Sequence, residues 1–283
     1  MKINVAKSAG FCFGVKRALN IASRTARPGI SVEMLGDIVH NEDVVREIEK
    51  SGIKKIKRLH QGKNKILLIR AHGAPADTFK KARRLGYNTI DATCPMVKEI
   101  HAIAKDAERR GYVVIVIGDK KHDEVRGITG QLKKKAIVID KLENIPIKQV
   151  KTIKKAAVVV QSTQNIEKVQ KIVAALRKYI QDLRFFNTIC RPTRIKQEEA
   201  NILPRNNDIM IIIGSKMSAN TKRLYEISKS LNNHSFWIQS KNEIRPQWFK
   251  KAKSVGITAG ASTPDAATKG VIKHIKKLSQ KKQ

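Results

Sequence analysis

Three short apolar-rich stretches, each ending in glycine, organise this chain. Continuous runs of β-branched and aliphatic residues at this length are typical of parallel strands buried on both faces. Each terminal glycine lies 24 residues after a cysteine, and one spacing found three times indicates an internal repeat. The stretches are 31–36, 112–118 and 209–214, and the pairs are Cys12 with Gly36, Cys94 with Gly118, and Cys190 with Gly214.

The rest of each repeat alternates strands with helices. A second apolar run ends in small polar groups, a helical pattern follows, and a third strand leads towards a cysteine. Such alternation predicts parallel α/β units. The predicted second strands are 66–73, 157–163 and 255–262, the helices 77–85, 166–179 and 265–278, and the third strands 87–94, 184–190 and, at the start of the chain, 3–6.

We therefore predict an α/β fold of three quasi-equivalent small parallel-sheet lobes around a pseudo-threefold axis. The predicted lobes are 13–94, 95–190 and 191–283, the last completed by residues 1–12. In such sheets ligands bind beyond the carboxyl ends of the strands. Since the three cysteines fall at those ends, we expect them to meet at one central site.

Three converging thiolates have more than one possible use. They can hold three irons of a cubane cluster and leave the fourth open, or they can bind zinc together with one histidine. Three unrelated buried thiols fit the matched offsets least well. No Cys-x-x-Cys pair is present, which disfavours an ordinary zinc knuckle. Counting cysteines does not decide between iron and zinc, but the many polar groups at the strand ends favour a catalytic cluster. The candidate fourth zinc ligands are His40, His72, His101 and His122.

A ring of hydrogen-bond donors is predicted around this centre. Donors of this kind, next to helix N-termini, suit a phosphate or diphosphate. The candidates at strand ends and repeat-equivalent positions are His40, His72, His122, Ser218, Asn220 and Ser262.

One carboxylate of the inner set is predicted to be a general acid. Glu124 follows Gly118 by six residues and His122 by two. A carboxyl buried near an anionic ligand has a raised pKa and holds its proton at neutral pH. Glu42 has the matching place in the first unit, but its polar neighbours indicate an exposed helix start and a structural or capping role.

The charge of the chain leaves a second function class open. Lys and Arg total 58 against 24 acidic residues, a net charge of +34. A basic nucleic-acid-binding protein with structural cysteines or zinc is therefore the alternative. However, the basic residues are spread along the chain and only 5% of residues are aromatic, which disfavours nucleic acid. With no apolar run near 18 residues we expect no membrane span, and three cysteines make a poor disulfide framework, so we expect a cytoplasmic protein.

Several segments, in one order, are similar to a known family. The chain resembles the 4-hydroxy-3-methylbut-2-enyl diphosphate reductase (LytB) family over nearly its whole length. The matching segments are 9–15 (AGFCFGV), 39–41 (VHN), 71–73 (AHG), 91–95 (DATCP), 122–125 (HDEV), 161–163 (QST), 187–190 (NTIC), 218–220 (SAN) and 260–265 (GASTPD).

The resemblance implies a reductive dehydroxylation that yields isopentenyl and dimethylallyl diphosphates, the final step of the non-mevalonate isoprenoid pathway. It implies one [4Fe–4S] cluster, an allylic diphosphate substrate, and a ferredoxin or flavodoxin as electron donor. The chain departs from the family pattern at Ser162, where threonine is usual, at Ala219 for serine, at Asp123 for proline, and at 191–192 after Cys190. The implied roles are cluster ligands for Cys12, Cys94 and Cys190, substrate binding for His40, His72, His122, Ser162, Ser218, Asn220 and Ser262, and proton donation for Glu124.

Overall fold

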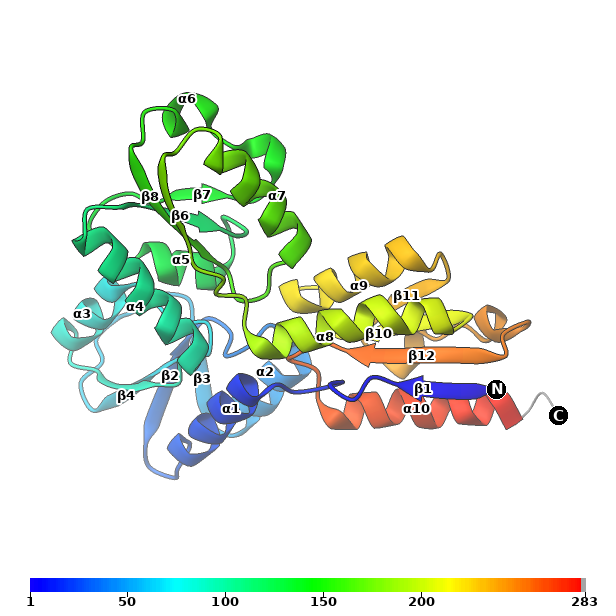
Figure 1. The fold of residues 1–283 in the computed structure, drawn as a ribbon. Coiled ribbons are helices and arrows are strands. Elements are labelled where there is room, and N and C mark those ends of the chain that lie inside the picture. Colours follow the sequence, from blue (N-terminus) through cyan, green and yellow to red (C-terminus); the bar gives the residue numbers. More distant parts are fainter. Residues whose placement is uncertain (281–283) are drawn as a thin grey trace. The chain divides into compact units, whose positions relative to one another are not determined.

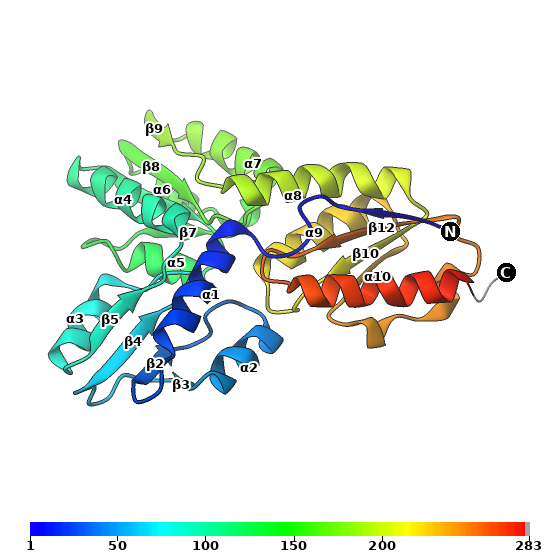
Figure 2. The same cartoon turned by 90° about the horizontal axis from the view of Figure 1, so that it is seen from below.

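A computed structural model describes residues 1–280, which form three four-stranded parallel sheets with helices packed on them (Figure 1, Figure 2). The chain divides into two compact units. Unit 1 comprises Met1–Lys16, His40–Val45 and the chain from Arg191 onward, and unit 2 comprises Arg17–Val39 and Arg46–Cys190. The predicted α/β fold of three parallel-sheet lobes is confirmed, whereas lobe boundaries at Cys94 and Cys190 stay a prediction.

Unit 2 contains two sheets of the same topology. The first has the order β3 (Ile53–Ile56), β2 (Ser31–Leu35), β4 (Lys65–Ile69), β5 (Asn88–Asp91). The second has the order β7 (Ile137–Ile139), β6 (Val113–Ile117), β8 (Lys155–Val160), β9 (Asp182–Phe185). The accompanying helices are α1 (Phe13–Thr25), α2 (Glu42–Lys50), α3 (Ala76–Arg84), α4 (Pro95–Arg109), α5 (Asp123–Thr129), α6 (Ile147–Val150), α7 (Ile166–Arg177) and the 3₁₀ turn Leu142–Asn144, of which α1 and α2 run across a unit boundary.

Unit 1 contains the third sheet, whose last strand comes from the start of the chain. Its order is β11 (Ser235–Ile238), β10 (Ile209–Ile213), β12 (Ser254–Ala259), β1 (Lys2–Val5). Because β1 pairs in parallel with β12, this sheet has the strand order of the other two. Its helices are α8 (Arg191–Ile202), α9 (Ala219–Leu231), α10 (Asp265–Gln280) and the 3₁₀ turns Leu203–Asn206, Lys241–Glu243 and Pro246–Phe249.

The repeat glycines have one structural role in all three sheets. Each lies at the end of an inner strand, and its backbone N–H donates to the carbonyl of the last residue of the edge strand. The three hydrogen bonds are Gly36 to Ile56 at 3.1 Å, Gly118 to Ile139 at 2.9 Å, and Gly214 to Ile238 at 2.9 Å. The spacing found in the sequence therefore reflects a repeated backbone hydrogen bond.

Both faces of the inner strands are largely buried, which explains why β6 and β10 are apolar throughout. In the third lobe, Ile209, Ile211 and Ile213 of β10 pack in one cluster with α10 residues. Met210 and Ile212 pack on the opposite face with α8 and α9 residues. Figures 1 and 2 show α10 on one side of this sheet and α8 and α9 on the other.

The edge strands and the helices that follow the cysteines were not among the predicted elements. In β3 only Ile53 and Ile56 are buried, because a short edge strand needs few apolar residues. The predicted strand at 184–190 is also displaced, since β9 begins at Asp182 and ends at Phe185. None of the helices within residues 1–280 is both long enough and apolar enough to cross a membrane.

Candidate active site

Each of the three cysteines directly precedes a helix. Cys12 comes before α1, Cys94 before α4, and Cys190 before α8. All three are partly buried and none forms a disulfide. The N-terminus of a helix favours negative charge, and the thiolate is the form of cysteine that binds iron. The three positions therefore suit metal-binding thiolates.

The cysteines are also held by equivalent hydrogen bonds within their own lobes. In each case the backbone N–H of the cysteine donates to a carbonyl two residues beyond the end of a neighbouring strand. Cys12 donates to Ala261 at 3.1 Å, Cys94 to Ala71 at 3.0 Å, and Cys190 to Ser162 at 3.1 Å. These acceptors follow β12, β4 and β8 respectively. Three thiols in equivalent backbone positions fit a cluster with three protein ligands, and the convergence of their sulfur atoms stays a prediction.

Glu124 is a buried carboxyl in the first turn of α5, with 2% of its surface exposed. It accepts a hydrogen bond from the backbone N–H of Ser162 at 2.6 Å and another from the Ser162 hydroxyl at 2.8 Å. Burial raises the pKa of Glu124 to about 7, although both Ser162 hydrogen bonds act to lower it. A carboxyl with this pKa can hold and release a proton near neutral pH.

His122 and His72, predicted from different repeats, lie together in unit 2. Their rings are 5.4 Å apart between centroids and nearly perpendicular. His122 is the N-cap of α5, and its Nδ1 accepts from the backbone N–H of Glu124 at 3.2 Å. An accepting Nδ1 leaves the proton of a neutral ring on Nε2. His122 is therefore an Nε2–H donor next to the buried acid.

Unit 1 carries the other predicted donors at the end of its sheet. Ser218 caps α9, and its hydroxyl oxygen accepts from the backbone N–H of Thr221 at 3.2 Å. The Ser262 hydroxyl donates to the carbonyl of His40 at 3.1 Å. Asn220 is 3% exposed, and neither atom of its side-chain amide has a hydrogen-bond partner within residues 1–280. A buried amide without partners costs free energy, which a hydrogen bond to a ligand would offset, and substrate binding by Asn220 stays a prediction.

Glu42 differs from Glu124, as its sequence neighbours suggested. It is the exposed first residue of α2, and the helix is capped by the preceding Asn41. The Asn41 side chain accepts from the backbone N–H groups of Asp43 and Val44 at 3.1 and 3.2 Å. Sequence reasoning also missed Lys196, a buried lysine of α8, because a single lysine among charged neighbours gives no sign of burial.

Comparison with known proteins identifies one family. The sequence model of the family described as LytB protein matches residues 3–276. A 4-hydroxy-3-methylbut-2-enyl diphosphate reductase of Aquifex aeolicus is 38% identical over 282 residues, covering 98% of this chain and 97% of that protein. The same enzyme of Campylobacter hominis is 40% identical over 277 residues, covering 97% of this chain and 98% of that protein.

Two solved structures also match. The structure of (E)-4-hydroxy-3-methyl-but-2-enyl diphosphate reductase, described as the terminal enzyme of the non-mevalonate pathway, has a TM-score of 0.73 at 38% identity, covering 98% of this chain and 100% of that chain. The structure of the E-1-hydroxy-2-methyl-but-2-enyl-4-diphosphate reductase from Plasmodium falciparum has a TM-score of 0.88 at 25% identity, covering 96% of this chain and 87% of that chain. These matches give no support to the alternative of a nucleic-acid-binding protein.

Proposed function

Because this chain belongs to the LytB protein family, we propose that it is a 4-hydroxy-3-methylbut-2-enyl diphosphate reductase. The reaction removes the allylic hydroxyl of its substrate as water. It consumes two electrons and two protons, and yields isopentenyl and dimethylallyl diphosphates. We expect the reaction to take place in the cytoplasm.

Cys12, Cys94 and Cys190 are the proposed ligands of one [4Fe–4S] cluster. Their equivalent positions before helices and their equivalent backbone hydrogen bonds support one shared role. When bound, the cluster supplies the electrons of the reaction. The chain itself must then bind the diphosphate, orient the allylic hydroxyl and deliver protons.

Glu124 is the proposed proton donor. The main support for this role is its pair of hydrogen bonds with Ser162. Ser162 connects this acid to Cys190, because the Ser162 carbonyl accepts from Cys190 while its N–H and hydroxyl donate to Glu124. A proposed cluster ligand, a hydroxyl and a buried acid thus lie on one hydrogen-bonded path within unit 2. Burial keeps bulk water from the carboxyl, so the proton that it holds is available for the leaving hydroxyl.

The diphosphate is proposed to bind to donors at helix N-termini. His122 and Ser218 cap α5 and α9, where the positive end of the helix dipole favours an anion. The Nε2–H of His122 and the buried amide of Asn220 supply hydrogen bonds. His40, His72 and Ser262 are proposed for the same role, and Ser162 for holding the substrate hydroxyl.

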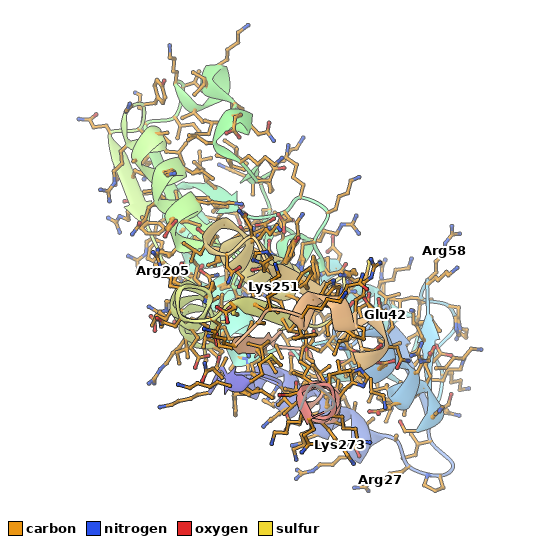
Figure 3. The ribbon with its side chains drawn as sticks, turned by 90° about the vertical axis from the view of Figure 1, so that its right-hand side faces the viewer. Arg27, Glu42, Arg58, Arg205, Lys251 and Lys273 are labelled. Carbon is orange, nitrogen blue, oxygen red and sulfur yellow. The ribbon has the colours of Figure 1, made fainter. Side chains whose placement is uncertain are left out.

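We propose a small acidic ferredoxin or flavodoxin as electron donor. Exposed basic side chains occur in both units, for example Arg205 and Lys273 in unit 1 and Arg27 and Arg58 in unit 2 (Figure 3). Positive surface charge increases the association rate with an acidic partner, and salt screens this attraction. Turnover supported by such a donor should fall with ionic strength more steeply than turnover supported by a small chemical reductant.

The test is anaerobic purification followed by iron and sulfide analysis, electron paramagnetic resonance, and turnover with a chemical reductant. We expect about four irons and four sulfides per chain, and both diphosphate products by mass spectrometry. Cys94→Ser should lose iron and activity together. Colourless protein with stoichiometric zinc, or an iron-loaded protein that does not consume the substrate, would contradict the proposal.

A further inference from the structure

Helix α8 carries a lysine that is buried in unit 1, with 1% of its surface exposed. A buried ammonium costs free energy unless it is fully hydrogen-bonded. The Nζ of Lys196 donates to three backbone carbonyls, those of Ser8, Gly10 at 3.1 Å and Ala259 at 3.0 Å. These contacts use all three donors of the side chain.

The carbonyls belong to the two segments that support Cys12. Ser8 and Gly10 lie in the loop between β1 and α1, just before the cysteine, and Ala259 is the last residue of β12. The cysteine's own N–H donates to Ala261, two residues beyond Ala259. Lys196 therefore links the loop that carries the thiol to the strand end on which the thiol rests.

A second side chain of α8 holds the same loop. Glu199, one helical turn beyond Lys196, accepts from the backbone N–H of Ser8 at 3.2 Å and from the Ser8 hydroxyl. Lys196 binds the loop's carbonyls and Glu199 its donors, so α8 fixes the loop through both kinds of backbone group.

The charge of Lys196 also lies within electrostatic range of the thiol. Burial lowers the pKa of Lys196 to about 8, and negative charges on Cys12, Glu199 and Asp265 act against this lowering. A methionine would fill a similar volume without the cost of burying a charge. Packing alone therefore does not account for an ammonium at this position.

We propose that Lys196 is a positioning residue for the cluster: it fixes the loop that carries Cys12 and places a positive charge beside this ligand. The inference rests on the proposed [4Fe–4S] cluster. Charge and hydrogen bonding around a cluster set its reduction potential, and positive charge favours the more negative, reduced state. Removing the charge should therefore make the cluster harder to reduce, and removing the hydrogen bonds should release iron sooner.

The experiment compares Lys196→Met, Lys196→Arg and Arg194→Met as iron-loaded proteins handled without oxygen. Arg194 is the matched control, since it lies on the exposed face of α8 and its replacement also removes one positive charge. Two properties are measured: the rate of iron release to a chelator, and the midpoint potential by redox titration followed by electron paramagnetic resonance. Lys196→Met should release iron about 10- to 100-fold faster, as expected for residues that support metal ligands, and its midpoint potential should be lower. Lys196→Arg keeps the charge but not the compact Nζ, so its midpoint potential should lie closer to that of the unmodified protein than the potential of Lys196→Met does.

Equal iron release and equal potential in Lys196→Met and Arg194→Met would overturn the inference while leaving the proposed function intact. Iron-free unmodified protein would overturn both. If Lys196→Met does not fold, which circular dichroism of the apo-protein decides, Glu199→Gln takes its place. That variant weakens the contact with Ser8 and should also release iron faster than Arg194→Met, and an unchanged rate would overturn the inference.

Discussion

The Glu124 carboxyl and Ser162 are joined by two hydrogen bonds, one from the backbone N–H at 2.6 Å and one from the hydroxyl at 2.8 Å. The two residues are 38 positions apart in the sequence, yet together they form the buried acid of the second lobe. The backbone bond fixes the carboxyl whatever residue stands at 162, whereas the hydroxyl bond depends on the serine side chain. The effects of the backbone bond and of the hydroxyl bond on the pKa of Glu124 can therefore be separated by mutation.

Replacement of Glu124 by glutamine should suppress turnover and leave the fold and the cluster in place. The amide keeps the shape and an acceptor for the Ser162 N–H, but it supplies no proton. General acid catalysis typically contributes about 10²- to 10⁴-fold, and we expect kcat to fall by this factor with little change in iron content. Single-turnover and steady-state rates under anaerobic conditions measure the effect.

Glu42→Gln is the matched control for this experiment. Glu42 has the repeat-equivalent position but is exposed at the start of α2, so its replacement should leave kcat unchanged. Near-normal turnover in Glu124→Gln would mean that another group donates the proton.

Removal of the Ser162 hydroxyl should move the pH dependence of turnover upward. The hydroxyl bond favours the ionised form of Glu124 and lowers its pKa, against the larger effect of burial. Since a hydrogen bond to a charged group contributes about 1.5 to 3 kcal/mol, its loss in Ser162→Ala should raise the alkaline limb of the kcat profile by about one to two pH units.

Ser162→Thr keeps the hydroxyl and should keep the pH profile, because the backbone bond and the hydroxyl donor are both present. An alkaline limb in Ser162→Ala that coincides with that of Ser162→Thr would show that the hydroxyl does not influence the acid.

The repeat and the sheets could be predicted because their causes are local in the sequence. Strands β6 and β10 are buried on both faces and have continuous apolar runs, whereas Glu33 interrupts the run of β2. The glycine after each strand makes the same backbone hydrogen bond to the edge strand. The edge strands could not be predicted in this way. Only the two end residues of β3 are buried, and Lys54 and Lys55 between them are exposed, so the segment has no clear strand pattern.

The candidate site was predictable in its residue types and less so in its contacts. The offset from Gly118 pointed to Glu124, but its bond to Ser162 depends on the pairing of neighbouring segments and has no sequence pattern. The burial of Lys196 is of the same kind, because its three acceptors are backbone carbonyls far away along the chain. Backbone acceptors exist at every residue, so no residue type marks them.

The departure from the family pattern at Asp123 has a structural partner. Asp123, where proline is usual, accepts from Arg70 at 2.7 Å, and the two side chains are 20% and 17% exposed. The pair joins the residue after β4 to the first residue of α5. Because it is mostly shielded from solvent, Asp123→Ala should lower the free energy of unfolding by about 1.5 to 3 kcal/mol, measured by chemical denaturation of the apo-protein.

The control for this pair is Asp77→Ala in α3. Asp77 pairs with Lys80 at 3.2 Å, but these side chains are 89% and 73% exposed, and exposed pairs contribute little. Equal destabilisation by the two variants would contradict a specific role for the Arg70–Asp123 pair.

Two buried groups of unit 2 should give opposite pH dependences of stability. Burial, helped by the charge of Lys105, lowers the pKa of His101 to about 4. Unfolded chains bind this proton near pH 6.5, so between pH 6.5 and 4 the unfolded state holds more protons and stability falls as the pH falls. Burial instead raises the pKa of Glu124 from 4.5 to about 7, so between these values the folded state holds more protons and stability falls as the pH rises.

Replacing either residue should remove the pH dependence of stability that its side chain causes. In denaturation experiments on the apo-protein from pH 4 to 8, His101→Gln should reduce the acid-side loss of stability, and Glu124→Gln should reduce the loss between pH 4.5 and 7. The exposed His234 provides the control His234→Gln, which should leave both slopes in place. Slopes are compared rather than absolute stabilities, because each substitution also changes packing. If His101→Gln and His234→Gln have the same acid-side slope, His101 does not resist protonation in the folded state, and its side chain must be accessible to water.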